Sequence, residues 1–299
     1  MAPRHLVATD RVRDLVRHPA FAGFGRLLLP WDDRAYDEDM PLSEIGSLLP
    51  YHSHVEPKAV LGALNRMIDA VSDGRTIFYD IYTAEQKEQD PSRANTGLFF
   101  LRGNPGAPFA MICPGGGFSY VGALHEGFPY GTAIQDAGYN AFVLRYRARR
   151  GGEVATQDLA AAISYVFERA RTLGVSTDGY SLWGSSAGAR MAAAIGSHGV
   201  ASFGGSDVPR PSTVVMAYTG HADYSADDPP TFVVVGERDS IAPPSTMERR
   251  VRALRKLGIA VEFHRYPRLG HGFGVGSGTS AEGWISDALR FWSEHTQGA

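Results

Sequence analysis

The residue types best suited to chemistry in this chain stand in short turns rich in glycine. Ser186 is the centre of the run 184–188, Gly-Ser-Ser-Ala-Gly, which lies between a short apolar run and a helix-like stretch. A serine on a tight strand-to-helix turn needs small neighbours, and such a turn leaves its hydroxyl exposed above a sheet. The dipole of the following helix favours negative charge at that point. The pattern predicts that Ser186 is a nucleophile and that Ser185 takes no part in the chemistry.

A base and an acid for this serine are found further along the chain. A serine hydroxyl is a weak nucleophile and needs an adjacent base, for which histidine, with a pKa of about 6.5, is suited. His271 is flanked by glycines just after a β-type run, and it is the candidate base. A carboxylate must hold the tautomer of that histidine. Asp239 follows another β-type run and is the candidate acid, with Glu237 and Asp287 as alternatives.

A second glycine-rich turn could supply backbone donors. The run 114–118, Pro-Gly-Gly-Gly-Phe, directly follows the apolar run 109–113. Acyl transfer builds up negative charge on an oxygen, which preorganised backbone N–H groups stabilise. Glycine lets such amides face a ligand without a side chain in the way. We expect an oxyanion hole made by the amides of Gly116, Gly117 and Ala187, with the larger contributor among the two glycines left open.

Four side chains near these turns are candidate substrate-binding residues. Two of them follow the glycine run and two follow the β-type run 213–217: Phe118, Tyr120, His221 and Tyr224. Small-molecule pockets are mostly apolar with a few polar groups, which suits this set. Phe128 and Tyr130 are further aromatic candidates for the same wall. Packing in the core is the alternative for the aromatic residues, and an ordinary loop position is the alternative for His221 and Tyr224.

No metal site is expected. His52, His54 and Glu56 alternate at a spacing typical of ligands, but no further ligand cluster is near them in the sequence, so a packed or exposed turn is expected. His125 and Glu126 lack the second histidine of H-E-x-x-H, so the zinc-protease interpretation fails. The basic run 145–150 is expected to be a solvated edge, the alternative being that one arginine binds an anionic substrate group or orders a loop.

Composition excludes several classes of protein. The 299 residues carry a formal net charge of −3, so no overall basic field indicates nucleic acid or an anionic membrane as a partner. The single cysteine, Cys113, excludes an intramolecular disulfide and fits a reducing compartment. The first residues contain no apolar run of a secretory signal, and no window reaches the ~18 apolar residues of a spanning helix. We therefore expect a cytoplasmic protein.

The order of the elements predicts an α/β fold. Short β-type runs recur at 76–83, 97–102, 109–113, 141–146, 180–183, 213–217, 231–235 and 261–266. Helix-like stretches separate the later ones, at 122–137, 155–173, 187–197, 244–257 and 282–295. This order predicts a mostly parallel eight-stranded sheet with an antiparallel start and helices on both faces. Because such sheets bind ligands beyond the carboxyl ends of their strands, the candidate residues above are expected to meet there.

The residues before Arg75 have a different pattern. They lack β-type runs and show two helix-like stretches, at 11–18 and 57–71, with an irregular segment between them at 30–57. We expect residues 1–74 to be an N-terminal helical extension, either a cap over the site or a dimer contact, and residues 75–299 to be the catalytic domain.

With these residues the chain resembles the α/β-hydrolase superfamily, in which the order along the chain is also serine, acid, histidine. Within it the chain looks most like bacterial acetyl-esterase or xylan-esterase-like serine esterases, which are often grouped with dienelactone-hydrolase-like proteins. The resemblance covers roughly residues 75–295 and rests on five stretches: 112–118, 138–146, 184–188, 239–243 and 270–272. The N-terminal extension has no counterpart in the minimal fold.

The resemblance implies a cofactor-free hydrolase of short-acyl esters that acts through an acyl-enzyme. It assigns the nucleophile to Ser186, the acid to Asp239, the base to His271, and the oxyanion donors to Gly116, Gly117 and Ala187. Its partner would be a small-molecule ester, with a homodimer as an open question. The alternatives are a serine peptidase of the prolyl-oligopeptidase type, for which 299 residues leave no space for a propeller domain, and a non-catalytic ligand-binding protein.

Overall fold

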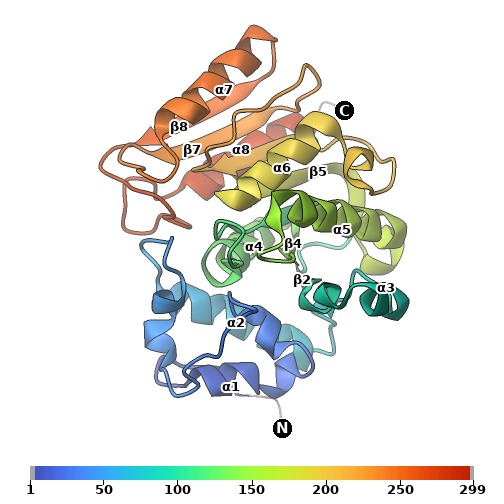
Figure 1. Ribbon diagram of the computed structural model, residues 1–299, viewed down its shortest axis with the longest axis vertical. Helices are drawn as coiled ribbons and strands as arrows, with labels where there is room; N and C mark the ends of the chain where they lie inside the picture. The colour runs from blue at the N-terminus through green and yellow to red at the C-terminus, as the bar shows by residue number, and fades with distance from the viewer. Residues whose placement is uncertain (1–3, 297–299) are drawn as a thin grey trace.

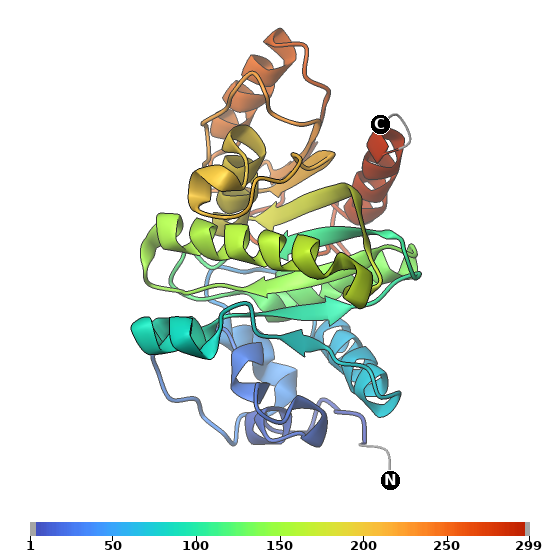
Figure 2. The same ribbon diagram turned by 90° about the vertical axis from the view of Figure 1, so that its right-hand side faces the viewer.

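The computed structural model describes residues 4–296, which are built around a single eight-stranded sheet (Figures 1 and 2). In chain order the strands are β1 (Phe78–Tyr79), β2 (Gly97–Leu101), β3 (Pro108–Cys113), β4 (Asn140–Arg145), β5 (Ser176–Ser185), β6 (Thr213–Ala217), β7 (Thr231–Gly236) and β8 (Val261–Tyr266). They lie side by side in the order β1-β2-β4-β3-β5-β6-β7-β8. The pairs β1–β2 and β2–β4 are antiparallel and the other pairs are parallel. This confirms the prediction of a mostly parallel sheet with an antiparallel start.

Helices cover both faces of the sheet, as predicted. They are α1 (Val12–Val16), α2 (Pro57–Ser72), α3 (Ala84–Gln89), α4 (Phe128–Asp136), α5 (Gly151–Leu173), α6 (Ala187–His198), α7 (Pro244–Lys256) and α8 (Trp284–Thr296). α5, α6 and α7 lie on one face, and α4 packs with α8 on the other (Figures 1 and 2). In α5 the buried residues Leu159, Ile163 and Val166 recur at helical spacing, and Gly174 ends the helix in a left-handed conformation. The central strands are therefore buried on both sides, which is why they read as continuous apolar runs.

The bounds or the type of several expected elements differ from the structure. The predicted strand 76–83 is reduced to two residues at the sheet edge, because Thr83 instead caps the N-terminus of α3, a helix that the sequence pattern did not predict. The Thr83 hydroxyl accepts from the amide of Gln86, whose side chain accepts from the Thr83 amide, and this reciprocal cap stabilises a short helix. The predicted helix 122–137 begins as a π-helical turn, Ala123–Gly127, before α4. β5 starts at Ser176 rather than at Tyr180.

The N-terminal segment (blue in Figure 1) packs against β1 and β2 through Phe24 and against α4 through α2. Between α1 and α2 it forms three 3₁₀ turns, at Pro19–Phe21, Gly25–Leu28 and Leu42–Leu48. The Phe24 ring stacks on Phe78 of β1 at 4.7 Å between centroids. Buried apolar residues of the segment, among them Leu15 and Leu64, belong to the same hydrophobic cluster as the strands. The segment therefore shares the core of the rest of the chain.

The basic run after β4 is not the solvated edge that its composition suggested. Arg145 is buried, and its guanidinium donates to the carbonyl oxygen of Pro30 at 3.0 Å and pairs with Asp32. Arg147 is also buried and pairs with Asp158 at 2.7 Å. A buried guanidinium must be paired to be tolerated, and these carboxylates satisfy that need. The expectation was wrong for these two arginines, since Arg145 holds the N-terminal segment on the sheet.

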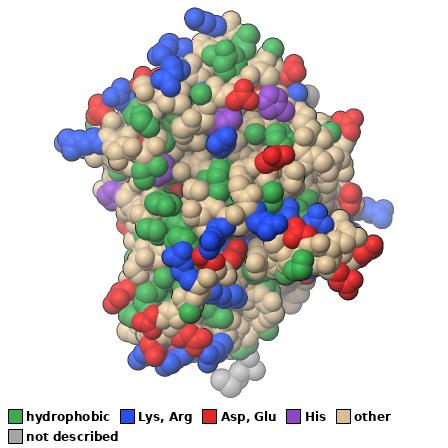
Figure 3. Space-filling model, viewed as in Figure 1, with side chains coloured by type: hydrophobic (Ala, Val, Ile, Leu, Met, Phe, Trp, Pro, Cys, Tyr) green, Lys and Arg blue, Asp and Glu red, His purple; other side chains and the backbone are tan. Residues whose placement is uncertain are grey.

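Charged side chains of both signs are interspersed on the face of the molecule shown in Figure 3. Many of them form exposed ion pairs, such as Arg66 with Asp136. Such pairs contribute little to stability, since water screens them. Between residues 4 and 296, no helix has the length and apolar character needed to span a membrane.

Candidate active site

Ser186 lies on a sharp turn between β5 and α6. Its backbone has φ 50° and ψ −114°, a conformation that is strained for a residue with a side chain. The neighbouring glycines make the turn possible, because a methyl group on Gly188 would overlap the carbonyl oxygen of Cys113, and one on Gly184 would overlap the Gly188 carbonyl. The Ser186 amide donates to Ala217 of the adjacent strand at 2.8 Å. Packing and hydrogen bonding thus hold the serine at the carboxyl end of the sheet.

The structure brings Ser186, His271 and Asp239 together. His271 Nε2 lies 3.0 Å from Ser186 Oγ, and His271 Nδ1 lies 2.7 Å from Asp239 Oδ2. The other oxygen of Asp239 accepts from the amides of Ile241 and Ala242, at 2.9 and 2.7 Å. The acid comes from the turn after β7 and the histidine from the turn after β8. This geometry lets the imidazole accept the serine proton while the buried carboxylate holds the ring.

The two alternative acids lie elsewhere. Glu237 is half-exposed and pairs with Arg265 at 3.3 Å. Asp287 stands in the first turn of α8. In the described part of the chain, Asp239 is the sole carboxylate that hydrogen-bonds to His271.

The glycine turn after β3 faces the serine. A methyl group on Gly115 would come within 2.9 Å of Ser186 Cβ. Three amides near Ser186 donate no hydrogen bond to any group among residues 4–296: those of Gly116, Gly117 and Ala187. Gly117 and Ala187 line the same cavity as Ser186, whereas Gly116 packs against Tyr120. The geometry favours Gly117 and Ala187 as oxyanion donors, and the part of Gly116 stays a prediction.

A cavity of about 760 Å³ opens beside Ser186. Of the four predicted pocket residues, Phe118 and His221 line it. Tyr120 does not: it is fully buried, with its hydroxyl 2.8 Å from His52. Tyr224 is also outside the cavity, on a loop where it is 45% exposed. These two expectations were wrong, because proximity along the chain does not determine the direction of a side chain.

Several lining residues were missed by the sequence analysis. Arg190, Glu153 and Asp223 give the cavity charged walls, and Ile241 adds an apolar one. Arg190 lies four residues after Ser186, about one turn along α6, so helical spacing from Ser186 could have identified it. Glu153 lies in the first turn of α5 and Asp223 in the loop after β6, and no local pattern in the sequence relates them to Ser186. Phe128 and Tyr130 are core residues.

The candidate ligand residues of the N-terminal segment do not form a metal cluster. His54 is exposed, whereas the His52 side chain is buried, with Nε2 3.1 Å from the carboxylate of Glu126. Across residues 4–296 no three histidine, cysteine or carboxylate side chains gather closely enough to hold a metal ion. His125 is buried as well, and this burial, with His52 beside it, lowers its pKa to about 4.

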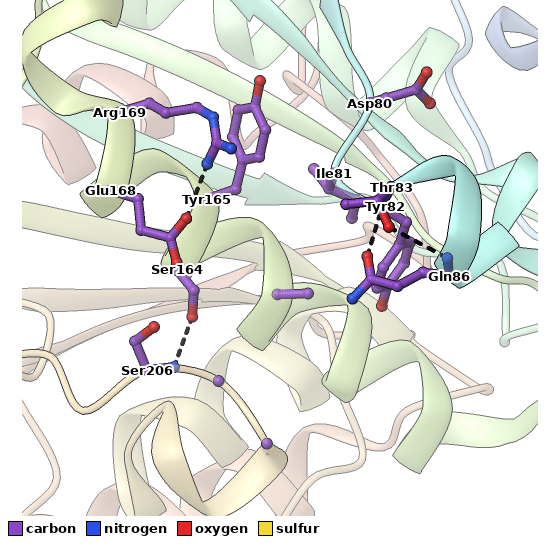
Figure 4. Close-up of a pocket in the computed structure, with 13 residues that line it drawn as sticks. Asp80, Ile81, Tyr82, Thr83, Gln86, Ser164, Tyr165, Glu168, Arg169 and Ser206 are labelled. Carbon is purple, nitrogen blue, oxygen red and sulfur yellow. Dashed lines mark hydrogen bonds and ion pairs between the residues drawn. The ribbon is translucent and has the colours of Figure 1, made fainter.

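A second cleft of about 650 Å³ lies away from Ser186, between α5, the turn before α3 and the loop 204–206 (Figure 4). Its polar groups pair with one another. Arg169 lies 2.9 Å from Glu168, and the Ser206 amide donates to Ser164 Oγ at 2.7 Å. The cleft therefore offers no nucleophile–base pair and no converging set of free polar groups.

Two family models match parts of the chain. The prolyl oligopeptidase family matches residues 207–299, which include Asp239 and His271, and the BD-FAE family matches residues 104–213, which include Ser186 and the glycine turn. Neither match spans half of the chain. None of the curated protein sequences matched it.

Similar solved structures have the same architecture. An acetyl ester-xyloside bifunctional hydrolase from Caldicellulosiruptor lactoaceticus superposes with a TM-score of 0.63 at 22% identity, over 73% of this chain and 95% of that one. An α/β hydrolase from a Medee basin deep-sea metagenome library gives 0.58 at 24% identity, over 68% and 93%. A carboxylesterase from Lactobacillus plantarum gives 0.57 at 21% identity, over 67% and 92%. The chain therefore has the α/β-hydrolase fold, as the sequence resemblance implied.

Proposed function

We propose that this chain, with its α/β-hydrolase fold, is a serine carboxylesterase that hydrolyses short-acyl esters through an acyl-enzyme. The observation that carries the proposal is the line of contacts from Asp239 through His271 to Ser186, at 2.7 and 3.0 Å. This line ends at a cavity of about 760 Å³, where the amides of Gly117 and Ala187 are free to donate.

The chemistry follows from the positions of these groups. Ser186 Oγ attacks the ester carbonyl carbon while His271 Nε2 takes the serine proton. The carbonyl oxygen becomes an oxyanion that accepts from the free amides of the glycine turn and of Ala187. His271 then gives its proton to the departing alcohol, which leaves the acyl group on the serine. A water molecule, deprotonated by His271 in the same way, attacks the acyl carbon and releases the acid.

The charged lining of the cavity supports short, polar esters as substrates. Arg190, Glu153 and Asp223 line it, so a long alkyl chain would have to strip water from these groups without pairing them. One solved structure with the same fold is named as an acetyl ester-xyloside hydrolase. Acetyl and butyryl esters are therefore the substrates to test first.

A peptidase of the prolyl-oligopeptidase type is the second candidate, since that family model matches residues 207–299. A panel of p-nitrophenyl acetate, butyrate and octanoate, run beside a prolyl p-nitroanilide, separates the two. The first proposal predicts turnover of the short esters, none of the anilide, and a fall in kcat of about 10⁶ in Ser186→Ala.

The matched control is Ser185→Ala, because the Ser185 hydroxyl points away from the base and bonds to the Tyr130 hydroxyl at 3.1 Å. It should keep most of the activity. Turnover by Ser186→Ala equal to that of the wild type would refute the role of Ser186 as nucleophile. No turnover of any ester or of the anilide by the wild type would refute the esterase proposal and favour a ligand-binding protein on this fold.

A further inference from the structure

Three consecutive residues of the N-terminal segment reach the turn that carries His271. The amide of Ser53 donates to the carbonyl oxygen of Gly272 at 2.9 Å. The hydroxyl of Ser53 donates to the carbonyl oxygen of His271 itself, at 2.7 Å. Both bonds act on the backbone of the turn, so they determine where the imidazole stands relative to Ser186. We call Tyr51, His52 and Ser53 the 51–53 clasp.

The clasp also reaches the glycine turn after β3. The Tyr51 amide donates to the Tyr120 hydroxyl at 3.0 Å, and His52 Nδ1 lies 2.8 Å from the same hydroxyl. His52 Nε2 lies 3.1 Å from Glu126 Oε1. One arrangement pairs every group: Tyr120 donates to His52 Nδ1, and His52 Nε2–H donates to the carboxylate of Glu126.

Glu126 transmits this contact to the glycine turn. Its carboxylate is fully buried, and Oε2 accepts from the Gly115 amide at 2.5 Å, while Oε1 accepts from the Tyr218 hydroxyl at 2.7 Å. Burial raises the pKa of Glu126, but the contacts with His52 and with the Tyr218 hydroxyl lower it, and the net effect holds the pKa of this carboxyl below its usual range. The side chain is therefore ionised at neutral pH, and a buried carboxylate keeps its charge only while such donors surround it. Tyr218 packs in turn against the His271 ring, with centroids 5.0 Å apart.

The clasp is closely packed against both turns. A methyl group on Gly122 would come within 2.7 Å of His52 Nε2. One on Gly272 would come within 2.5 Å of the Tyr51 carbonyl oxygen and 2.8 Å of His52 Cα. Glycines therefore stand where the clasp lies directly on the turns that bear the base and the oxyanion donors.

We infer that the 51–53 clasp and Glu126 are positioning residues, which lock the His271 turn and the glycine turn in the geometry that catalysis needs. The inference rests on the proposed esterase function. A displacement of about 1 Å in either turn would lengthen the distance over which the serine proton is transferred, or would point the oxyanion donors away from the carbonyl oxygen. Such a displacement lowers kcat and leaves the affinity for the substrate largely unchanged. The N-terminal segment is thus part of the catalytic apparatus without contacting the reacting atoms.

The first test compares Ser53→Ala with Ser43→Ala, a matched change at an exposed serine of the same segment whose hydroxyl makes no hydrogen bond in the described residues. Loss of one hydrogen bond to the His271 turn should lower kcat for p-nitrophenyl acetate about tenfold. KM should change less than about twofold, because substrate contacts are untouched. Ser43→Ala should keep the wild-type kcat.

The second test removes the contact to Glu126. His52→Leu leaves the carboxylate without its imidazole donor and should lower kcat about a hundredfold. His52→Gln, which keeps an N–H donor, should recover part of that loss, and His54→Asn, at an exposed position with φ 55°, should have no effect. Activities are measured well below the unfolding temperature of each variant, so a purely structural role would leave kcat unchanged.

Amide hydrogen exchange makes the result independent of turnover. Residues 115–122 and 270–274 should exchange faster in Ser53→Ala and His52→Leu than in the wild type. Folded variants with wild-type kcat and wild-type exchange in both turns would overturn the inference. If the wild type hydrolyses no ester, the proposed function fails, and the exchange rates alone then decide whether the clasp holds the two turns.

Discussion

At the scale of single residues, the site depends on which carboxylate faces the imidazole. One oxygen of Asp239 accepts hydrogen bonds from two backbone amides of its own turn, and the other oxygen faces His271. The turn therefore determines the orientation of the Asp239 carboxylate. A carboxylate in this position stabilises the imidazolium that forms when the serine proton is transferred. Glu237, two residues earlier, points to Arg265 at the surface.

Asp239→Asn should lower kcat by about 10⁴ with the fold intact, because an amide in that place favours the wrong tautomer of His271. Glu237→Gln is the matched control and should behave as the wild type. Steady-state kinetics on p-nitrophenyl acetate, with circular dichroism of each variant, provide the measurement. A large decrease in kcat in Glu237→Gln, with little change in Asp239→Asn, would show that Glu237 is the acid of the triad.

A buried histidine makes stability depend on pH. Burial, with His52 beside it, lowers the pKa of His125 from 6.5 to about 4, so the unfolded chain binds more protons than the folded one between these values. The free energy of unfolding is therefore not affected by the titration of His125 above pH 6.5, and it decreases as the pH falls from 6.5 towards 4. The loss should be on the order of 2–3 kcal/mol in the free energy of unfolding.

Urea unfolding at a series of pH values checks this. The wild type should lose stability steadily from pH 6.5 to pH 4. His125→Gln, which keeps an N–H donor for the Gly272 carbonyl but does not titrate, should show a shallower slope in that window. Parallel slopes in the two proteins would show that His125 is not the group responsible.

At the scale of elements, glycine has different roles in the turn from β5 to α6 and in the long helix α2. Gly188 lies where α6 begins against β3, so that an added methyl group would overlap the Cys113 carbonyl. Gly62 is inside α2, and no atom lies within 4 Å of the place where its Cβ would be. Both glycines are helical, so a comparison between them isolates packing from backbone preference.

Gly188→Ala should destabilise the protein by more than about 3 kcal/mol, because backbone rather than a flexible side chain would have to move. Gly62→Ala should raise the free energy of unfolding by about 0.5–1 kcal/mol, since alanine is the better helix former. Chemical denaturation measures both. Equal small effects at the two sites would contradict the close approach of α6 to β3.

At the scale of the whole molecule, the N-terminal segment and the sheet share one core. The segment buries Leu15 and Leu64 in the same cluster as the strands, and Arg145 of β4 is neutralised by Asp32. Removal of the segment would expose the apolar surface that it covers and would take away the carboxylate that pairs with Arg145. The stability of a typical domain is small enough to be lost when part of its core is removed.

A chain that begins at Arg75 is therefore expected to be insoluble or unfolded, and the full chain to unfold in one cooperative transition. Expression of the shortened chain, followed by calorimetry of the intact protein, provides the test. A soluble, active chain of residues 75–299 would show that the extension is a separable cap, and would also contradict the positioning role of the 51–53 clasp.

Much of the fold could be predicted because it depends on neighbours in the chain. Apolar runs determine the buried strands, helical spacing determines α5, and glycines around Ser186 and His271 mark the turns at the ends of strands. These patterns are local, and the parallel topology then brings the carboxyl ends of the strands to one edge. The eight-stranded fold and the candidate residues Ser186, Asp239 and His271 follow from that logic.

Only the tertiary structure decided which side chains face the site from afar. His52 and Glu126, or Ser53 and His271, are too far apart in the chain for any local period to relate them, and Tyr120 turns into the core although it follows the glycine turn. The buried pairing of Arg145 is equally invisible in a run of basic residues. The physical reason is that burial and pairing depend on what the folded chain packs against each group, whereas propensity and periodicity depend only on its sequence neighbours.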